Sequence, residues 1–162
     1  MVAIQTGRLY GIGVGPGDPE LLTLKAFRLL QSAPVIAYQA ANDHESIALS
    51  IVAPYLTGNQ IEVCFHFPRA LDPEAAHDLY TEAITPIASH LAAGRDVVVL
   101  CAGDPLFYGS FMYLFTRLAD QYITEVVPGI SSPMAAAAAI GTPICYQNDI
   151  FSVLAATLPT EV

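Results

Sequence analysis

The chain has 162 residues, 54% hydrophobic and 13% charged, a composition that indicates a packed globular core and excludes an intrinsically disordered chain. Fifteen Asp and Glu against six Lys and Arg give a formal net charge of -9, which disfavours nucleic acids and anionic membranes as partners. The sequence has no apolar run of the roughly 18 to 20 residues that cross a bilayer, nor a basic, then apolar, opening segment. We therefore expect a soluble, cytoplasmic protein.

Short β-rich segments alternate with segments of helical period along the chain. Strands are predicted at 8–14, 34–39, 60–67, 96–102 and 122–128, and helices at about 19–32, 44–56, 73–93, 106–119 and 131–140. This alternation builds right-handed βαβ units around parallel strands. The predicted fold class is α/β, with a largely parallel five-stranded sheet flanked by helices.

A second unit is predicted near the end of the chain. The stretch after Gly141 is rich in turn residues, and a new apolar run that begins near Ile150 predicts the first strand of another α/β domain. We divide the chain into an N-terminal domain over 1–143 and a linker with the start of a second domain over 144–162. We expect the chain to be the N-terminal part of a longer protein.

Several polar residues have an ordinary structural interpretation. Asp18 and Asp72 each precede a Pro-Glu pair, which predicts that they are helix N-caps. The cysteines are far apart in apolar contexts, which predicts core thiols in a reducing compartment, and the histidines lack ligand spacing, so no metal site is predicted. These residues are Cys64, Cys101 and Cys145, and His44, His66, His77 and His90.

The glycine-rich segment "YGIGVGPGDPELLTLKA" begins within the first predicted strand and does not match the sequence patterns of phosphate-binding loops. A dinucleotide fingerprint read from Gly11 has Pro16 in place of its third glycine, and one read from Gly13 has Asp18 there. A P-loop requires a lysine at the helix start, and the only lysine, Lys25, comes too late. The loop lets a ligand approach the main chain, but it is not electrostatically suited to phosphate.

Two further glycine-containing loops follow predicted strands. "CAGDPLFYGS" spans 101–110 and "VVPGISSP" spans 126–133. Because the carboxyl ends of parallel strands meet at one edge of a sheet, all three loops are expected at the edge where open α/β sheets bind ligands. Loops of small residues without basic side chains suit a ligand that is neutral or cationic near its reactive centre.

The motifs "GIGVGPGDPELLTLKA", "AGDPLFYGS" and "VVPGISS", in this order and spacing, resemble the tetrapyrrole methylases, which methylate corrin and sirohaem precursors with S-adenosylmethionine. "YQAANDHESIALSIVAPYL" and "GDPLFYGSFMYLFTRL" are most similar to the precorrin-2 C20-methyltransferase branch of cobalamin biosynthesis. The resemblance implies a homodimer, a tetrapyrrole substrate, and a methyl donor bound in the cleft between two domains.

The resemblance also implies which residues contact the methyl donor, mostly through main-chain groups. They are Pro16, Ala102, Gly103, Asp104, Phe107, Ser131 and Ser132. Carbonyl oxygens and an acidic surface suit a sulfonium cation better than helix-terminal amides do. Asp104 precedes Pro105 and is equally typical of a helix cap, so we expect cap and site together.

The catalytic base is not assigned. The uroporphyrinogen methylases of this family place an aspartate, proposed as a proton acceptor, after the tyrosine that closes the second strand, whereas here Gln39 follows Tyr38. This difference favours the C20 branch. The tyrosines Tyr10, Tyr38, Tyr108 and Tyr113 are predicted to line the core or the cleft rather than to act in catalysis.

The substrate implied by the resemblance carries many carboxylates, and the chain offers few cations to bind them. Arg69, in the loop after the third predicted strand, is the predicted substrate contact. The alternatives within the family are a cobalt-loaded substrate, another ring position, or uroporphyrinogen-III. Outside it, the alternatives are a Rossmann-type nucleotide module and an inactive fragment that only dimerises.

Overall fold

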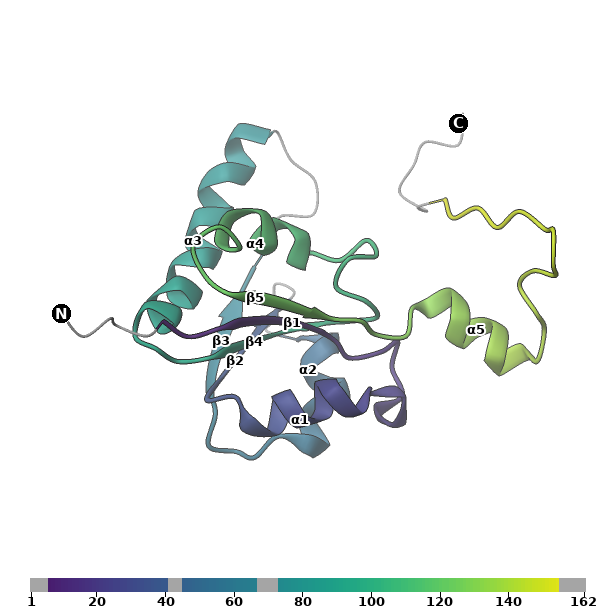
Figure 1. Cartoon of the computed structure of the whole chain (residues 1–162), viewed down its shortest axis with the longest axis horizontal. Helices are drawn as coiled ribbons and strands as arrows, with labels where there is room; N and C mark the ends of the chain where they lie inside the picture. The colour runs from purple at the N-terminus through teal and green to yellow at the C-terminus, as the bar shows by residue number, and fades with distance from the viewer. Residues whose placement is uncertain (1–5, 41–44, 67–72, 155–162) are drawn as a thin grey trace. The chain divides into compact units, whose positions relative to one another are not determined.

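The computed structural model describes residues 6–40, 45–66 and 73–154 and contains one parallel sheet (Figure 1). Within these residues the sheet has five strands in the order β3-β2-β4-β1-β5, and every neighbouring pair is parallel. The strands are β1 Leu9–Gly13, β2 Val35–Gln39, β3 Ile61–Phe65, β4 Val97–Cys101 and β5 Thr124–Val127. The predicted α/β class and all five predicted strands are confirmed.

The helices connect the strands in the alternation that the sequence predicts. They are α1 Leu24–Ser32, α2 Ile47–Val52, α3 Pro73–Ala92, α4 Phe111–Leu118 and α5 Ser132–Ile140, with short 3-10 helices at η1 Pro19–Leu21 and η2 Ala53–Tyr55. The described helices include none with the length and apolarity to span a membrane.

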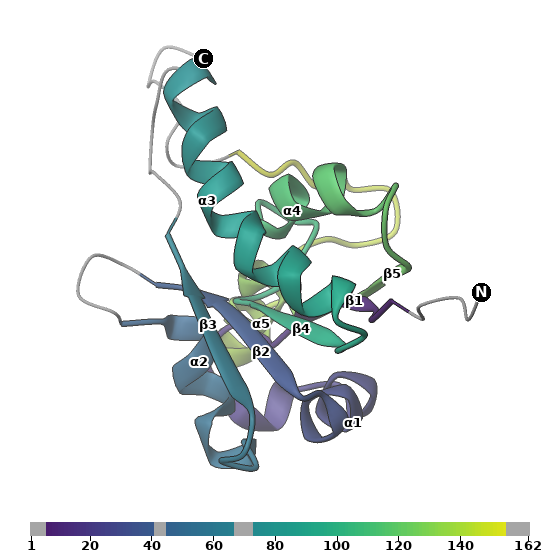
Figure 2. The ribbon, with the colours of Figure 1, turned by 90° about the vertical axis from the view of Figure 1, so that its left-hand side faces the viewer.

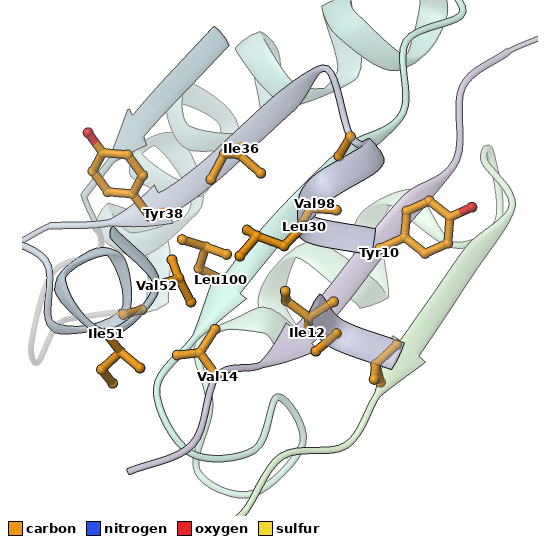
Figure 3. Packing of buried hydrophobic residues seen from close by; sticks show 14 of the residues in the cluster. Tyr10, Ile12, Val14, Leu30, Ile36, Tyr38, Ile51, Val52, Val98 and Leu100 are labelled. Carbon is orange, nitrogen blue, oxygen red and sulfur yellow. The ribbon is translucent and has the colours of Figure 1, made fainter. Parts of the chain in front are cut away.

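Both faces of the sheet are covered (Figure 2). Side chains of β1, β2 and β4 that point to one face, such as Ile12, Ile36 and Leu100, form a cluster with Leu30 of α1 and Ile51 of α2 (Figure 3). The alternate side chains of the same strands pack with α3 and α4 on the other face. A sheet buried on both faces explains why β4 reads as the continuous apolar run "VVVLC".

Two predicted helices differ from those observed. The helix predicted at 19–32 is interrupted, because Leu22 is extended and Thr23 starts α1 as an N-cap that accepts a hydrogen bond from Ala26 N–H at 3.2 Å. The helix predicted from residue 106 starts only at Phe111, because residues 104–110 form a folded loop.

The cysteine prediction is wrong for two of the three residues. Cys101 is buried in β4, but Cys64 and Cys145 are exposed. Cys64 lies on β3, one of the two edge strands of the described sheet, where the side chains that alternate with Val63 and Phe65 remain open to solvent. The apolar neighbours of Cys64 in sequence therefore belong to the opposite face of the strand.

The chain divides into two compact units, one ending at Ser132 and one starting at Pro133. The second unit contains most of α5 and, over residues 141–154, turns and irregular chain with no strand in that described stretch. The remainder of the predicted second-domain strand lies outside the described residues. The predicted boundary between 143 and 144 therefore stays a prediction.

Candidate functional site

Three loops meet at the carboxyl edge of the sheet: the β1 loop (residues 14–18), the β4 loop (102–110) and the β5 loop (128–131). Strand β1 lies between β4 and β5, so the three loops follow three consecutive strands of the sheet. Gly15 and Gly103 form an antiparallel bridge in which Gly103 N–H donates to Gly15 O at 2.8 Å and Gly15 N–H donates to Gly103 O at 3.3 Å. The β1 and β4 loops are therefore joined main chain to main chain.

The main chains at Gly13, Gly103 and Gly129 are in direct contact. A Cβ atom at Gly129 would lie 2.1 Å from Gly103 O and 2.7 Å from Gly13 Cα, and one at Gly13 would lie 2.4 Å from Gly129 N. Any side chain at either position would collide with backbone. Gly103 also has a φ of +70°, a left-handed conformation that favours glycine. Glycine is therefore required to bring these three loops together.

Asp104 connects the β4 loop to the β5 loop through its carboxylate. Its Oδ2 accepts a hydrogen bond from Gly129 N–H at 3.0 Å, and its Oδ1 accepts one from Leu106 N–H at 2.9 Å. The residue at the N-cap position of α4 is Ser110, which makes no side-chain capping bond. The prediction that Asp104 caps the following helix is therefore wrong, because its carboxylate is held by the β5 loop and by its own turn.

By contrast, the capping prediction for Asp18 is confirmed. Its Oδ1 accepts a hydrogen bond from Glu20 N–H at 2.8 Å at the start of η1. Asp72 lies outside the described residues. Asp18 and Asp104 thus both accept a hydrogen bond from the main-chain N–H two residues later, and Asp104 differs by its additional bond to Gly129 and by the absence of a helix after it.

The tip of the β4 loop exposes three consecutive apolar side chains. Leu106, Phe107 and Tyr108 are exposed, and the rings of Phe107 and Tyr108 meet edge to face with centroids 5.1 Å apart. Tyr108 has a φ of +53°, an uncommon conformation for an aromatic residue that costs about 1 kcal/mol or more. A Cβ at Gly109 would lie 2.4 Å from Pro105 O, so the loop folds tightly on itself.

The predicted donor contacts occupy this edge. Pro16, Gly103 and Asp104 are half-buried in the joined β1 and β4 loops, and an added Cβ at Gly103 would lie 4.0 Å from Ser131 Cα. Ala102, Phe107 and Ser132 are exposed. The predicted substrate contact, Arg69, lies outside the described residues. Sequence reasoning did not anticipate the roles of Gly13 and Gly129, because their contact depends on the strand order.

Charged side chains are distributed unevenly between the two edges of the sheet. The β1 loop contains Asp18 and the β4 loop contains Asp104, and none of the β1, β4 and β5 loops contains Lys or Arg. Arg8 and Arg95 lie at the opposite, amino edge, and Lys25 of α1 forms an ion pair with Glu125 of β5. Main-chain groups and carboxylates therefore dominate the candidate site, an environment that suits a cationic ligand and not a phosphate.

Tyr38, near the carboxyl end of β2, belongs to the packed cluster, with its hydroxyl pointing away from the cluster (Figure 3). The hydroxyl donates a hydrogen bond to Glu62 Oε2 on β3 at 2.9 Å. Burial, this hydrogen bond and the nearby charge of Glu62 raise the pKa of Tyr38 to about 12. The phenol therefore stays protonated at neutral pH and is no ready proton acceptor, in agreement with its predicted packing role.

Comparisons with known proteins place these features in context. The family described as Tetrapyrrole (Corrin/Porphyrin) Methylases matches residues 8–161. The chain is 44% identical over 161 residues to the cobalamin biosynthesis protein CobIJ of Mycobacterium tuberculosis, covering 94% of this chain and 32% of that protein. It is 39% identical to the precorrin-2 C(20)-methyltransferase of Sinorhizobium sp, covering 98% of this chain and 68% of that protein.

A solved structure with a bound ligand has the same fold. It is the uroporphyrin-III C-methyl transferase of Thermus thermophilus complexed with S-adenosyl homocysteine, which is 30% identical and covers 88% of this chain and 51% of its own, with a TM-score of 0.60. The chain thus spans between about a third and two thirds of the length of these three similar proteins.

Proposed function

Because the chain belongs to the tetrapyrrole methylase family, we propose that it contains donor-binding loops of an S-adenosylmethionine-dependent methyltransferase that acts on C20 of precorrin-2 in cobalamin biosynthesis. The observation that carries this proposal is the carboxyl edge, where three glycine-containing loops are joined through their main chains and carry no basic side chain. The 39% identity to a precorrin-2 C(20)-methyltransferase supports the choice of substrate.

The residues at this edge fit the proposed donor. The donor supplies a methyl group on a positively charged sulfur, and nearby carbonyl oxygens and carboxylates stabilise positive charge. The proposed contacts are Pro16, Ala102, Gly103, Asp104, Phe107, Ser131 and Ser132. Their contribution is to fix the donor in one orientation, so that the nucleophilic carbon of the tetrapyrrole can approach the methyl group in line.

The two carboxylates of the joined loops, Asp18 and Asp104, both accept main-chain hydrogen bonds, and neither is proposed as the catalytic base. Gln39 ends β2 at the position where the resemblance to uroporphyrinogen methylases implies an aspartate, and an amide side chain does not accept a proton at neutral pH. This difference favours C20 methylation over uroporphyrinogen-III methylation. A cobalt-loaded substrate or another ring position remain alternative proposals within the family.

The rest of the proposal concerns the substrate, assembly and location. We propose Arg69 as a contact for a substrate carboxylate, a homodimeric assembly, and a cytoplasmic location. An inactive fragment that only dimerises is the non-enzymatic alternative.

The first experiment is a calorimetric titration of the chain with S-adenosylhomocysteine, with NAD as the control ligand. We expect saturable heat with S-adenosylhomocysteine and none with NAD. Heat with NAD alone would favour the Rossmann-type alternative. An absence of heat at millimolar S-adenosylhomocysteine would reject donor binding by this chain, and a dimer in sedimentation would then favour the non-enzymatic alternative.

The substrate contact is tested separately by Arg69→Ala. We expect weaker tetrapyrrole binding and unchanged affinity for S-adenosylhomocysteine, because the proposed donor contacts lie in other loops. Unchanged tetrapyrrole affinity would reject Arg69 as a substrate contact.

A further inference from the structure

Both oxygens of the Asp104 carboxylate accept a hydrogen bond from a main-chain N–H group. Oδ1 binds Leu106 N–H at 2.9 Å in its own loop, and Oδ2 binds Gly129 N–H at 3.0 Å in the β5 loop. Hydrogen bonds to an ionised carboxylate are about twice as strong as those between neutral groups. Asp104 is therefore a strong connection between two loops that follow non-adjacent strands, β4 and β5.

We propose that Asp104 is a positioning residue for the methyl donor, whose carboxylate holds the β4 and β5 loops together while the main chains of those loops make the contacts. This inference rests on the proposed function and changes the role assigned to Asp104 within it. The bond to Gly129 fixes that residue where its main chain contacts Gly13 and Gly103. The side chain thus acts on the donor through the backbone that it holds.

The chemistry of the site requires two acceptors on one short side chain. Both partners of the carboxylate are N–H donors, so Asn at this position would satisfy one of them and present its own NH2 group to the other. Glu would keep the negative charge and both acceptors, but its additional methylene displaces them from the two N–H groups. Asp104→Asn therefore removes an acceptor and the charge, whereas Asp104→Glu retains the charge and changes the geometry.

The test compares the affinity of the original chain, Asp104→Asn and Asp104→Glu for S-adenosylhomocysteine by calorimetry. The matched control is Asp96→Asn, because Asp96 Oδ1 also accepts a main-chain hydrogen bond, from Arg8 N–H at 2.8 Å, but at the amino edge of the sheet. We expect both Asp104 variants to bind between about tenfold and a hundredfold more weakly, since the loops would be less often in the binding arrangement. Asp96→Asn should bind as the original chain does.

Amide hydrogen exchange at Gly129 provides a readout that does not need the donor. We expect faster exchange at Gly129 in both Asp104 variants, with melting temperatures close to that of Asp96→Asn. If Asp104→Glu keeps the original affinity and Asp104→Asn loses it, the negative charge of residue 104 attracts the ligand directly, and loop positioning is not its role. Original affinity in both variants, or unchanged exchange at Gly129, would also overturn the proposal.

The outcomes separate this inference from the proposed function. If the original chain gives no heat with S-adenosylhomocysteine, the proposed function of the chain fails, and the claim that Asp104 positions the donor fails with it. Faster Gly129 exchange in the variants would then still support the loop connection. If the original chain binds and the variants bind equally well, the proposed function stands and the role of Asp104 is overturned.

Discussion

Main chains are in close contact at both edges of the sheet, at Gly7 and Arg95 on the amino edge and at Gly13, Gly103 and Gly129 on the carboxyl edge, but the side chains around these contacts differ. At the amino edge, charged side chains accompany the chain connections: Arg95 Nε donates to His90 Nδ1 at 2.9 Å, and Asp96 accepts from Arg8 N–H at 2.8 Å. At the carboxyl edge, main chains meet directly at Gly13, Gly103 and Gly129. The three joined loops of the carboxyl edge carry no Lys or Arg, and this is the difference that makes them the edge that we propose to bind the cationic donor.

The strongest test of this comparison places one methyl group at each edge. In Gly129→Ala the new Cβ would lie 2.1 Å from Gly103 O, and in Gly7→Ala it would lie 2.1 Å from Arg95 O. Because neither obstacle is a flexible side chain, we expect each variant to lose about 3 kcal/mol or more of unfolding free energy in urea denaturation.

Donor binding distinguishes these two variants. Under conditions in which both remain folded, Gly129→Ala should give no heat with S-adenosylhomocysteine, because its main chain is displaced from the joined loops. Gly7→Ala should bind as the original chain does. Equal loss of binding in both variants would mean that the carboxyl edge is not specifically involved.

A milder pair of variants tests the left-handed glycines. Gly103 has a φ of +70° in the β4 loop, and Gly58 has a φ of +77° between η2 and β3. An alanine side chain has space at both positions, since its Cβ would be 3.9 Å from the nearest atom at Gly103 and would meet nothing within 4 Å at Gly58. We expect each Gly→Ala variant to lose about 1 to 2 kcal/mol of stability from the backbone conformation alone.

The Gly103→Ala variant should also bind S-adenosylhomocysteine about tenfold more weakly, equivalent to about 1.4 kcal/mol. The new methyl group would point toward Ile130 O and Ser131 in the β5 loop. Gly58→Ala serves as the control, with a similar loss of stability and unchanged affinity. A Gly103→Ala variant that binds as tightly as Gly58→Ala would place the donor away from this part of the β4 loop.

The features that the sequence could predict are those that depend on neighbouring residues, and the features that it could not predict depend on contacts between distant parts of the chain. The strands are recognisable because apolar residues buried on both faces make continuous local runs, as in "VVVLC" of β4. The common edge of the three glycine-containing loops could also be predicted, because each loop directly follows a parallel strand. The role of Asp104 could not, because Asp-Pro is locally typical of a helix cap while its partner Gly129 is 25 residues away. The exposure of Cys64 likewise depends on β3 being an edge strand.

A smaller effect is expected from Tyr38→Phe, which removes the hydrogen bond to Glu62 near the carboxyl end of β2. We expect a loss of about 1 kcal/mol or less at neutral pH. The folded protein keeps the Tyr38 proton up to a pKa of about 12, whereas an unfolded tyrosine releases it near 10. Between these values the folded state binds more protons, so rising pH favours unfolding.

Urea denaturation from neutral pH to the alkaline range measures this difference. The stability of the original chain should fall more steeply than that of Tyr38→Phe above a pH of about 10, so that the two converge. Parallel pH profiles would mean that Tyr38 does not retain its proton in the folded state.

The smallest expected effect is a change in the pKa of His90 at the amino edge. Burial and then the positive charge of Arg95 lower the pKa of His90 below its usual value. Folded His90 therefore binds a proton less readily than unfolded His90, and stability falls as the pH drops through the ordinary histidine range. Arg95→Leu removes the second cause and leaves burial, so the pKa of His90 should rise only part of the way to its usual value.

The His90 pKa is measured from its ring proton signals in NMR titrations of the original chain and Arg95→Leu. Arg28→Leu is the control, because α1 covers the face of the sheet opposite to α3, which carries His90. A pKa that rises in Arg95→Leu alone would show that the amino edge is an electrostatically coupled cluster, unlike the main-chain contacts of the carboxyl edge. An unchanged pKa would mean that burial alone sets it, and the two edges would then differ in composition without differing in how their side chains interact.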